Sequence, residues 1–114
     1  MDLLERYANM AVIVGKPQID LHRLTAAVAV STVECWLVSL VVSSLRLPLK
    51  KHLVIITGRG SHSGDGEALL QSVTLRLLNH QLQPPLIATV DDSNAGRVIV
   101  RSADFEAWVR AAIL

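Results

Sequence analysis

The sequence is poor in the residues that mark several specialised classes of protein. Its single cysteine, Cys35, forms neither an internal disulfide nor a metal cluster, so nothing points to an oxidising compartment. Aromatic residues make up only 4% of the chain, too few for the stacking surface of a single-strand nucleic-acid binder. The formal net charge is only +1, so the binding of a nucleic acid would depend on a local patch of cations.

Apolar residues, by contrast, are abundant. They form 51% of the 114 residues, whereas charged residues form 18%, below the roughly 25% of an average globular protein. This excludes a disordered chain and predicts one domain with a substantial core. We divide the sequence into an N-terminal extension, residues 1–17, in which Leu3, Leu4 and Tyr7 indicate a short helix, and a domain over residues 18–114.

The longest apolar stretch, residues 26–45, is long enough to span a membrane. Glu34 lies near its middle, at a cost of about 2.5–3.5 kcal/mol in a bilayer, and five serines and threonines accompany it. We therefore expect a helix of the domain core and no membrane association. The first ten residues, MDLLERYANM, lack the features of a secretory signal or a transit peptide, so we expect no targeting segment in this chain.

Hydrophobic periodicity predicts the first half of the domain. Residues 18–22, QIDLH, alternate as a strand does. Thr25 suits the N-cap of a helix that runs to about Arg46, with a core face formed by Ala26, Val30, Val33, Leu37, Leu40, Val41 and Leu45. The opposite stripe of this helix would be exposed on a monomer, so we expect a protein partner to cover Ser31, Cys35, Val38 and Val42.

The second half begins with an apolar strand at residues 52–57, HLVIIT, and a glycine-rich loop over residues 58–66. Asp65 caps the next helix, Pro84-Pro85 ends it, and its core stripe is Leu69, Leu70, Val73, Leu77 and Leu78. Two further strands, residues 86–90 and 97–101, flank a turn at residues 91–96. A final helix over residues 104–113 is expected to bury Phe105, Trp108 and Val109.

Two polar residues of the first strand form the first candidate site. Alternating strands and helices indicate parallel strands, whose carboxyl ends form the usual ligand-binding edge of a sheet. Asp20 and His22 share one face of the strand near that edge, where they would act as an acid/base pair or hold a water or a metal ion. A purely structural alternative remains open, in which Asp20 accepts backbone hydrogen bonds and His22 caps the next helix.

The loop TGRGSHSGDGE is the second candidate site. Its glycines allow close backbone approach, and it precedes a helix N-terminus, where free N–H groups favour an anion. It is neither a Walker A motif nor a GxGxxG motif, and Asp65 and Glu67 disfavour a tightly held nucleotide phosphate. Weak contacts with a nucleic-acid backbone would come instead from Arg59, His62, Arg97 and Arg101. The structural alternative is a glycine turn with a solvated arginine.

The order of these motifs resembles that of the small MutS-related (Smr) domain. The resemblance covers about residues 18 to 112 and rests on IDLH, a long helix, VIITGRGSHS and the closing NAGRVIVRSADFEAWV. Smr domains carry an LDxH strand and a (H/T)GxG loop, which fall here on residues 19–22 and on Thr57, Gly58, Arg59 and Gly60. The sequence departs from the family in Ile19, where the motif has leucine, and in Arg23, where the family often has glycine.

The resemblance implies both a fold and an activity. The fold is an α/β two-layer sandwich with a four-stranded mixed sheet, a βαβαββ core, and helices at both ends. The activity is binding or endonucleolytic cleavage of RNA or DNA, with Asp20 and His22 catalytic and Mg²⁺ or Mn²⁺ as a possible cofactor held by Asp20. Arg23 would add a cation beside them. The closest form is that of plant pentatricopeptide-repeat proteins, which implies a chloroplast or mitochondrial location and upstream repeats as the partner.

These observations leave three functions open. The first is an endonuclease in which Asp20 positions a water, His22 assists proton transfer, and Arg59 with the Gly58–Gly60 backbone holds the phosphate. The second is a nucleic-acid-binding module that uses the same edge without catalysis. The third is a protein-interaction domain that uses the exposed stripe of the long helix.

Overall fold

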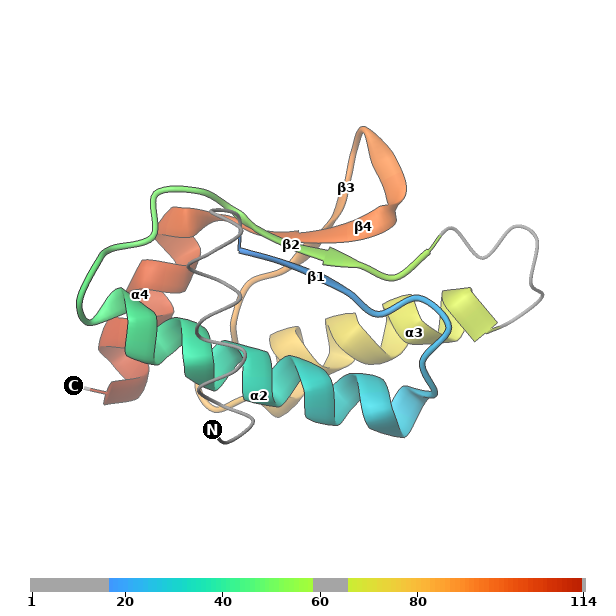
Figure 1. The fold of residues 1–114 in the computed structure, drawn as a ribbon, viewed down its shortest axis with the longest axis horizontal. Helices are drawn as coiled ribbons and strands as arrows, with labels where there is room; N and C mark the ends of the chain where they lie inside the picture. The colour runs from blue at the N-terminus through green and yellow to red at the C-terminus, as the bar shows by residue number, and fades with distance from the viewer. Residues whose placement is uncertain (1–16, 59–65, 114) are drawn as a thin grey trace.

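The fold is given by a computed structural model, which describes residues 17–58 and 66–113. The expected helix at Leu3–Tyr7 lies outside these residues. The elements along the chain are β1 (Gln18–Asp20), α2 (Ala26–Ser44), β2 (Leu53–Ile56), α3 (Gly66–Arg76), η1 (Leu77–Gln81), β3 (Thr89–Asp91), β4 (Asn94–Val100) and α4 (Ser102–Ile113). Figure 1 shows the sheet above α2 and α3, with α4 at one end of the helical layer.

The four strands form one mixed sheet in the order β1-β2-β4-β3. β1 and β2 are parallel, as the intervening helix predicts, and β4 is antiparallel to both β2 and β3. β4 is thus inserted between two strands that precede it in the chain. The predicted α/β class, with a mixed four-stranded sheet and a C-terminal helix, is confirmed.

Helix α2 begins where the sequence predicts, because the Thr25 hydroxyl accepts a hydrogen bond from the Val28 N–H at 3.3 Å. Its buried face is rotated from the predicted one and consists of Ala29, Val33, Trp36, Leu37, Ser39 and Leu40. Leu45 was expected in the core but is 68% exposed, because the helix ends at Ser44 and Leu45 caps it. By length and composition alone α2 also suffices to cross a membrane, a test that core helices of soluble proteins pass as well.

The helix that follows the glycine loop packs through Leu70, Thr74, Leu77 and Leu78. Leu69 lies one position off this face and is 52% exposed, so its predicted place in the core is wrong. The helix continues through the π-helical turn η1, where the Leu82 N–H donates to the Leu77 carbonyl.

The predicted strand at residues 86–90 is displaced towards the C-terminus. Leu86 donates its N–H to the Leu78 carbonyl, and the Asn79 side chain bonds both the N–H and the carbonyl of Ala88. Because these bonds replace strand pairing, β3 starts only at Thr89. β4 in turn starts at Asn94, three residues before the predicted start at Arg97, and ends at Val100.

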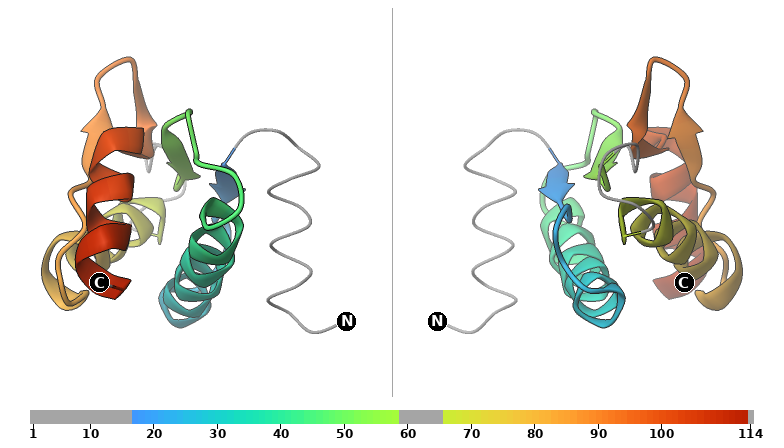
Figure 2. Two further views of the ribbon diagram at one scale, coloured as in Figure 1. Left: turned by 90° about the vertical axis from the view of Figure 1, so that its left-hand side faces the viewer. Right: turned by 90° about the vertical axis from the view of Figure 1, so that its right-hand side faces the viewer.

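Helix α4 closes the core at the end of the sheet away from the glycine loop. Phe105 is 1% exposed and stacks at 6.0 Å from Trp108, whose indole N–H donates to the Pro84 carbonyl. Trp108 and Val109 are half-buried against the core, so the predicted packing face is found. Helices α2, α3 and α4 all lie on one side of the sheet in both views of Figure 2.

Candidate functional site

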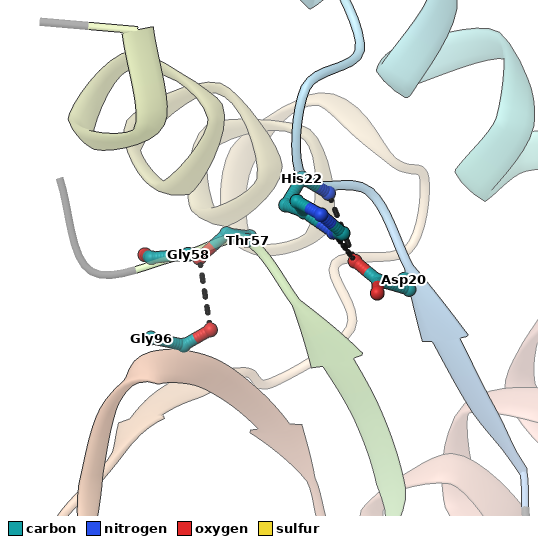
Figure 3. Close-up of polar contacts among 5 residues, drawn as sticks. All are labelled: Asp20, His22, Thr57, Gly58 and Gly96. Atoms are coloured by element: carbon teal, nitrogen blue, oxygen red, sulfur yellow. Dashed lines mark hydrogen bonds and ion pairs between the residues drawn. The ribbon is translucent and has the colours of Figure 1, made fainter. Parts of the chain in front are cut away.

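The two sequence motifs meet at one end of the sheet. Since β1 and β2 are parallel, their carboxyl ends share an edge, and antiparallel β4 begins at that same edge. Figure 3 shows Asp20 at the end of β1 and His22 after it, Thr57 and Gly58 after β2, and Gly96 in β4 across from them. We call this end of the sheet the rim.

Asp20 and His22 are held together by the turn that follows β1. The Asp20 Oδ1 atom accepts the His22 backbone N–H at 3.0 Å and lies 2.5 Å from His22 Nδ1. Both side chains remain about half exposed, at 49% and 44% respectively. The contact engages the imidazole through Nδ1, so Nε2 is the ring nitrogen that remains to bind a ligand. Carboxylates orient catalytic or metal-binding histidines in this way.

The surroundings of Asp20 favour its charged form. Partial burial works to raise the pKa of the Asp20 carboxyl, but hydrogen bonds from the His22 side chain and backbone, together with its charge, outweigh burial and lower that pKa. A carboxylate with a lowered pKa is a weak base. The pair therefore suits a division of roles in which Asp20 orients the imidazole or attracts a cation and His22 transfers protons.

The lowered pKa predicts how Asp20→Asn changes the pH dependence of stability. A depressed pKa stabilises the fold above the unfolded-state pKa of about 3.9, and this contribution is lost as the pH falls through the folded-state value. We expect the variant to be less stable than the wild type at neutral pH and equally stable in strong acid. Urea denaturation across this range measures the difference, and a pH-independent difference contradicts the assignment.

Arg23 follows the pair in the same turn. Its backbone φ is 71°, in the left-handed region that favours glycine, and the Leu24 N–H closes the turn on the Leu21 carbonyl at 3.1 Å. A glycine would adopt this backbone conformation at position 23 more readily than arginine does. In this chain the turn presents an exposed guanidinium next to the Asp20–His22 pair instead.

The start of the glycine loop is fixed to β4 through one carbonyl. Gly96 O accepts the N–H groups of Thr57 and Gly58, at 2.9 and 3.1 Å, and lies 3.4 Å from the Thr57 hydroxyl. Gly58 has a φ of 86°, a conformation that costs a residue with a Cβ roughly 1–2 kcal/mol. Thr57 is fully buried, so its contribution is to position Gly58 at the rim. Arg59, Gly60 and His62 lie outside the described residues.

The sheet register places Arg97 in line with Asp20, with Ile56 of β2 between them. Asp20 pairs with Ile56, and Ile56 pairs with Arg97, so the three side chains point to the sheet face that lies away from the helices. With strands about 4.8 Å apart, the Cα atoms of Asp20 and Arg97 are about 10 Å apart. A phosphate over Ile56 is within reach of both side chains. Arg101 follows the other end of β4, about 13 Å from Arg97 along the strand, so the structure does not bring it to the rim.

Two contacts that position the rim were not predicted from the sequence. Gly96 holds the start of the glycine loop, and the Gln71 side chain of α3 donates to the Ala95 carbonyl at 2.7 Å. Both join segments far apart in the chain, and no local pattern marks them. The only local signal is the turn chemistry at Asn94, whose side chain accepts the Gly96 N–H.

The described residues contain no group of three or more side chains suited to hold a metal ion. Asp20 and His22 together offer two ligands, and Mg²⁺ commonly uses one or two carboxylates together with waters and substrate phosphate. Asp20 is the only carboxylate of the pair, so it alone supplies an oxygen ligand of this kind, and His22 Nδ1 is already bonded to it. An apolar pocket of about 170 Å³, lined by Leu49, Phe105 and Val109 among others, lies at the opposite end of the sheet and away from this chemistry.

Comparison of the chain with protein-family models, with curated proteins and with solved structures finds no match.

Proposed function

We propose that the chain is a nucleic-acid-binding domain that cleaves phosphodiester bonds at the rim. One observation carries this proposal: the row Asp20–Ile56–Arg97 places a carboxylate with a bound imidazole and a guanidinium on the same open sheet face. An anionic backbone contacts the cation, and the acid/base pair lies next to it. Such a row needs no net basic charge on the protein.

In this proposal the residues of the rim have different roles. Arg97 holds the phosphate, because guanidinium groups bind phosphate oxygens. The Gly58 N–H already donates to the Gly96 carbonyl and therefore takes no part in holding the phosphate. His22 Nε2 transfers the proton between the attacking or leaving oxygen and solvent. Asp20 keeps the imidazole in place through its contact with Nδ1. A divalent ion, where one takes part, would be held at Asp20 and would neutralise charge on the phosphate.

The resemblance to Smr domains is consistent with this role, because its two motifs fall on residues of the same rim. IDLH ends in the Asp20–His22 pair, and TGRG begins with Thr57 and Gly58. From the resemblance we further propose RNA as the substrate in a plant chloroplast or mitochondrion, with upstream pentatricopeptide repeats supplying the sequence specificity.

The test is a cleavage assay with the purified chain. End-labelled single-stranded RNA and supercoiled plasmid are incubated with and without EDTA, next to the Asp20→Ala variant. Cleavage that Asp20→Ala removes supports the proposal, and the two substrates distinguish RNA from DNA. Loss of cleavage in EDTA assigns a role to a metal ion. Equal cleavage by the wild type and the variant contradicts the proposal.

The second candidate function is nucleic-acid binding without cleavage. It is favoured because, within the described part of the chain, the Asp20 carboxylate forms hydrogen bonds only with a residue close to it in the sequence. Both contacts that the structure gives the carboxylate run to His22, two residues away, which is also how a purely structural turn is built. A rim of this kind would bind nucleic acid without cleaving it. Binding without cleavage, unchanged in Asp20→Ala, identifies this alternative.

Arg97→Ala is expected to weaken binding to all sequences alike, because a contact with the backbone acts through released counterions. For one phosphate contact on a single strand, the slope of log K against log salt should fall by about 0.7. Arg101→Ala is the matched control, since it removes the same side chain beyond the other end of the same strand. Titrations at several salt concentrations measure both variants, and equal losses in the two contradict a specific role for Arg97.

A further inference from the structure

The second apolar face of α2 is open in the described structure. It consists of Val28, Ser31, Cys35, Val38, Val42 and Leu45, and we call it the outer α2 face. Its four aliphatic members are between 47% and 68% exposed. In both views of Figure 2, α3 and α4 lie on the same side of α2, so α2 is the outermost helix of the helical layer. An apolar stripe of this length on a monomer calls for a cover.

The spacing of the outer α2 face identifies the kind of element that fits it. Its members follow one another at alternating steps of three and four residues, the 3.5-residue repeat that keeps one seam against a second helix. From Val28 to Leu45 the seam is about 26 Å long at 1.5 Å per residue. The natural cover is therefore a helix with the same repeat.

The N-terminal extension carries that repeat. Leu3, Tyr7, Met10 and Val14 follow at steps of four, three and four residues, and Leu4 and Ala11 flank them on the same side of a helical projection. Three polar residues fall on the opposite side, Asp2, Glu5 and Asn9, and Arg6 borders the seam. Ala8, Val12 and Ile13 depart from the pattern. Such a sequence is amphipathic and has one apolar seam to bury.

The attachment point of this segment favours the same partner. The chain enters the described structure at Pro17, directly before β1, and β1 lies next to α2 at the edge of the sheet in both views of Figure 2. Gly15 and Lys16 form the whole connection. Twelve helical residues extend about 18 Å, which is shorter than the seam they would cover.

We propose that residues 3–14, which lie outside the described part of the chain, form a helix that packs on the outer α2 face. Leu3, Tyr7, Met10 and Val14 face the α2 seam, and the polar side faces water. A tether of two residues gives this segment an effective concentration in the millimolar range, which favours it over a second copy of the chain. The inference does not depend on the proposed nuclease activity.

The single native cysteine makes the test direct, because Cys35 lies in the middle of the outer α2 face. Leu3→Cys, Tyr7→Cys, Met10→Cys and Val14→Cys are made one at a time in the full chain. Facing Cα atoms of two packed helices lie about 5 Å apart, within the range of a disulfide. Glu5→Cys and Asn9→Cys are the matched controls on the polar side. Diamide joins two thiols as one disulfide and takes up their two hydrogens, and non-reducing mass spectrometry reads the product.

We expect at least one seam variant to form a disulfide within a monomer, at a rate at least tenfold above both controls. Dimers linked between two chains in every seam variant show that a second copy covers the face and overturn the proposal. Equal rates in seam and control variants, or no disulfide in any variant, also overturn it. Because four seam positions are tested, one variant that fails to fold does not decide the result.

Discussion

Asp20→Ala should lower the rate of phosphodiester cleavage at least tenfold, a barrier increase of about 1.4 kcal/mol, with little loss of folded protein. The variant removes the carboxylate that holds His22 Nδ1 and therefore leaves the imidazole free to rotate. It also removes the charge that attracts a cation to the rim. His22→Ala is expected to have an effect of similar size, because the two side chains act as a unit.

Asp91→Ala is the matched control for this result. The Asp91 Oδ1 atom accepts the backbone N–H of Ser93 at 2.9 Å and its hydroxyl at 2.8 Å, so the turn after β3 repeats the turn after β1 without a histidine. The Ser93 bonds, like those of His22 at Asp20, lower the pKa of the carboxyl, and the charge of Arg97 adds a smaller lowering at Asp91. Both variants therefore lose the same kind of turn contact, and thermal melting should show similar small shifts. If Asp91→Ala loses cleavage to the same extent while it binds nucleic acid as the wild type does, the Asp20 result reflects turn structure and not catalysis. Binding is measured in parallel because Asp91 lies close enough to Arg97 to be affected by its charge.

Phe105→Ala is expected to have the largest effect on stability, about 3–5 kcal/mol of the free energy of unfolding. Phe105 is 1% exposed and packs against Trp108. The pocket that it lines with Leu49 and Val109 would widen on its truncation, because the neighbouring side chains relax only in part. Urea denaturation followed by tryptophan fluorescence measures the change.

Ile113→Ala serves as the control, since it truncates an aliphatic side chain of the same helix that is 51% exposed. We expect a loss within about 0.5 kcal/mol there. Phe105 lies at the far end of the sheet from Asp20, so nucleic-acid binding per folded molecule should be unchanged in both variants. A loss of less than about 1 kcal/mol in Phe105→Ala contradicts the packing described for α4.

The parts of the fold that local chemistry determines were predictable from the sequence. The N-cap at Thr25, the strand at Leu53–Ile56 and the burial of Phe105 each depend on side chains near one another in the chain. The displaced start of β3 was not predictable, because the Asn79 side chain, nine residues away, takes the backbone groups of Ala88. The rotation of α2 depends in turn on which helix face meets the sheet, and the apolar pattern on both sides of α2 leaves that open.

One part of the candidate site was also predictable from the sequence, and another part was not. Asp20 and His22 are two residues apart, so their pairing follows from the strand pattern and the turn. The position of Arg97 depends on which residues of β2 pair with β4, and that register links positions about forty residues apart. The sequence treats Arg97 and Arg101 alike, and only the strand direction assigns one to the rim and the other to the opposite end.

The strand order also determines when this sheet can form during synthesis. β4 occupies the place between β2 and β3, although it follows both in the chain. Until residues 94–100 have left the ribosome, β3 has no neighbouring strand, and β2 can pair only with the three residues of β1. The apolar strand LVII is exposed during that interval, and an unpaired edge of this kind is prone to aggregation. We therefore expect a nascent chain stalled before β4 to be more prone to aggregation than the chain with the complete sheet.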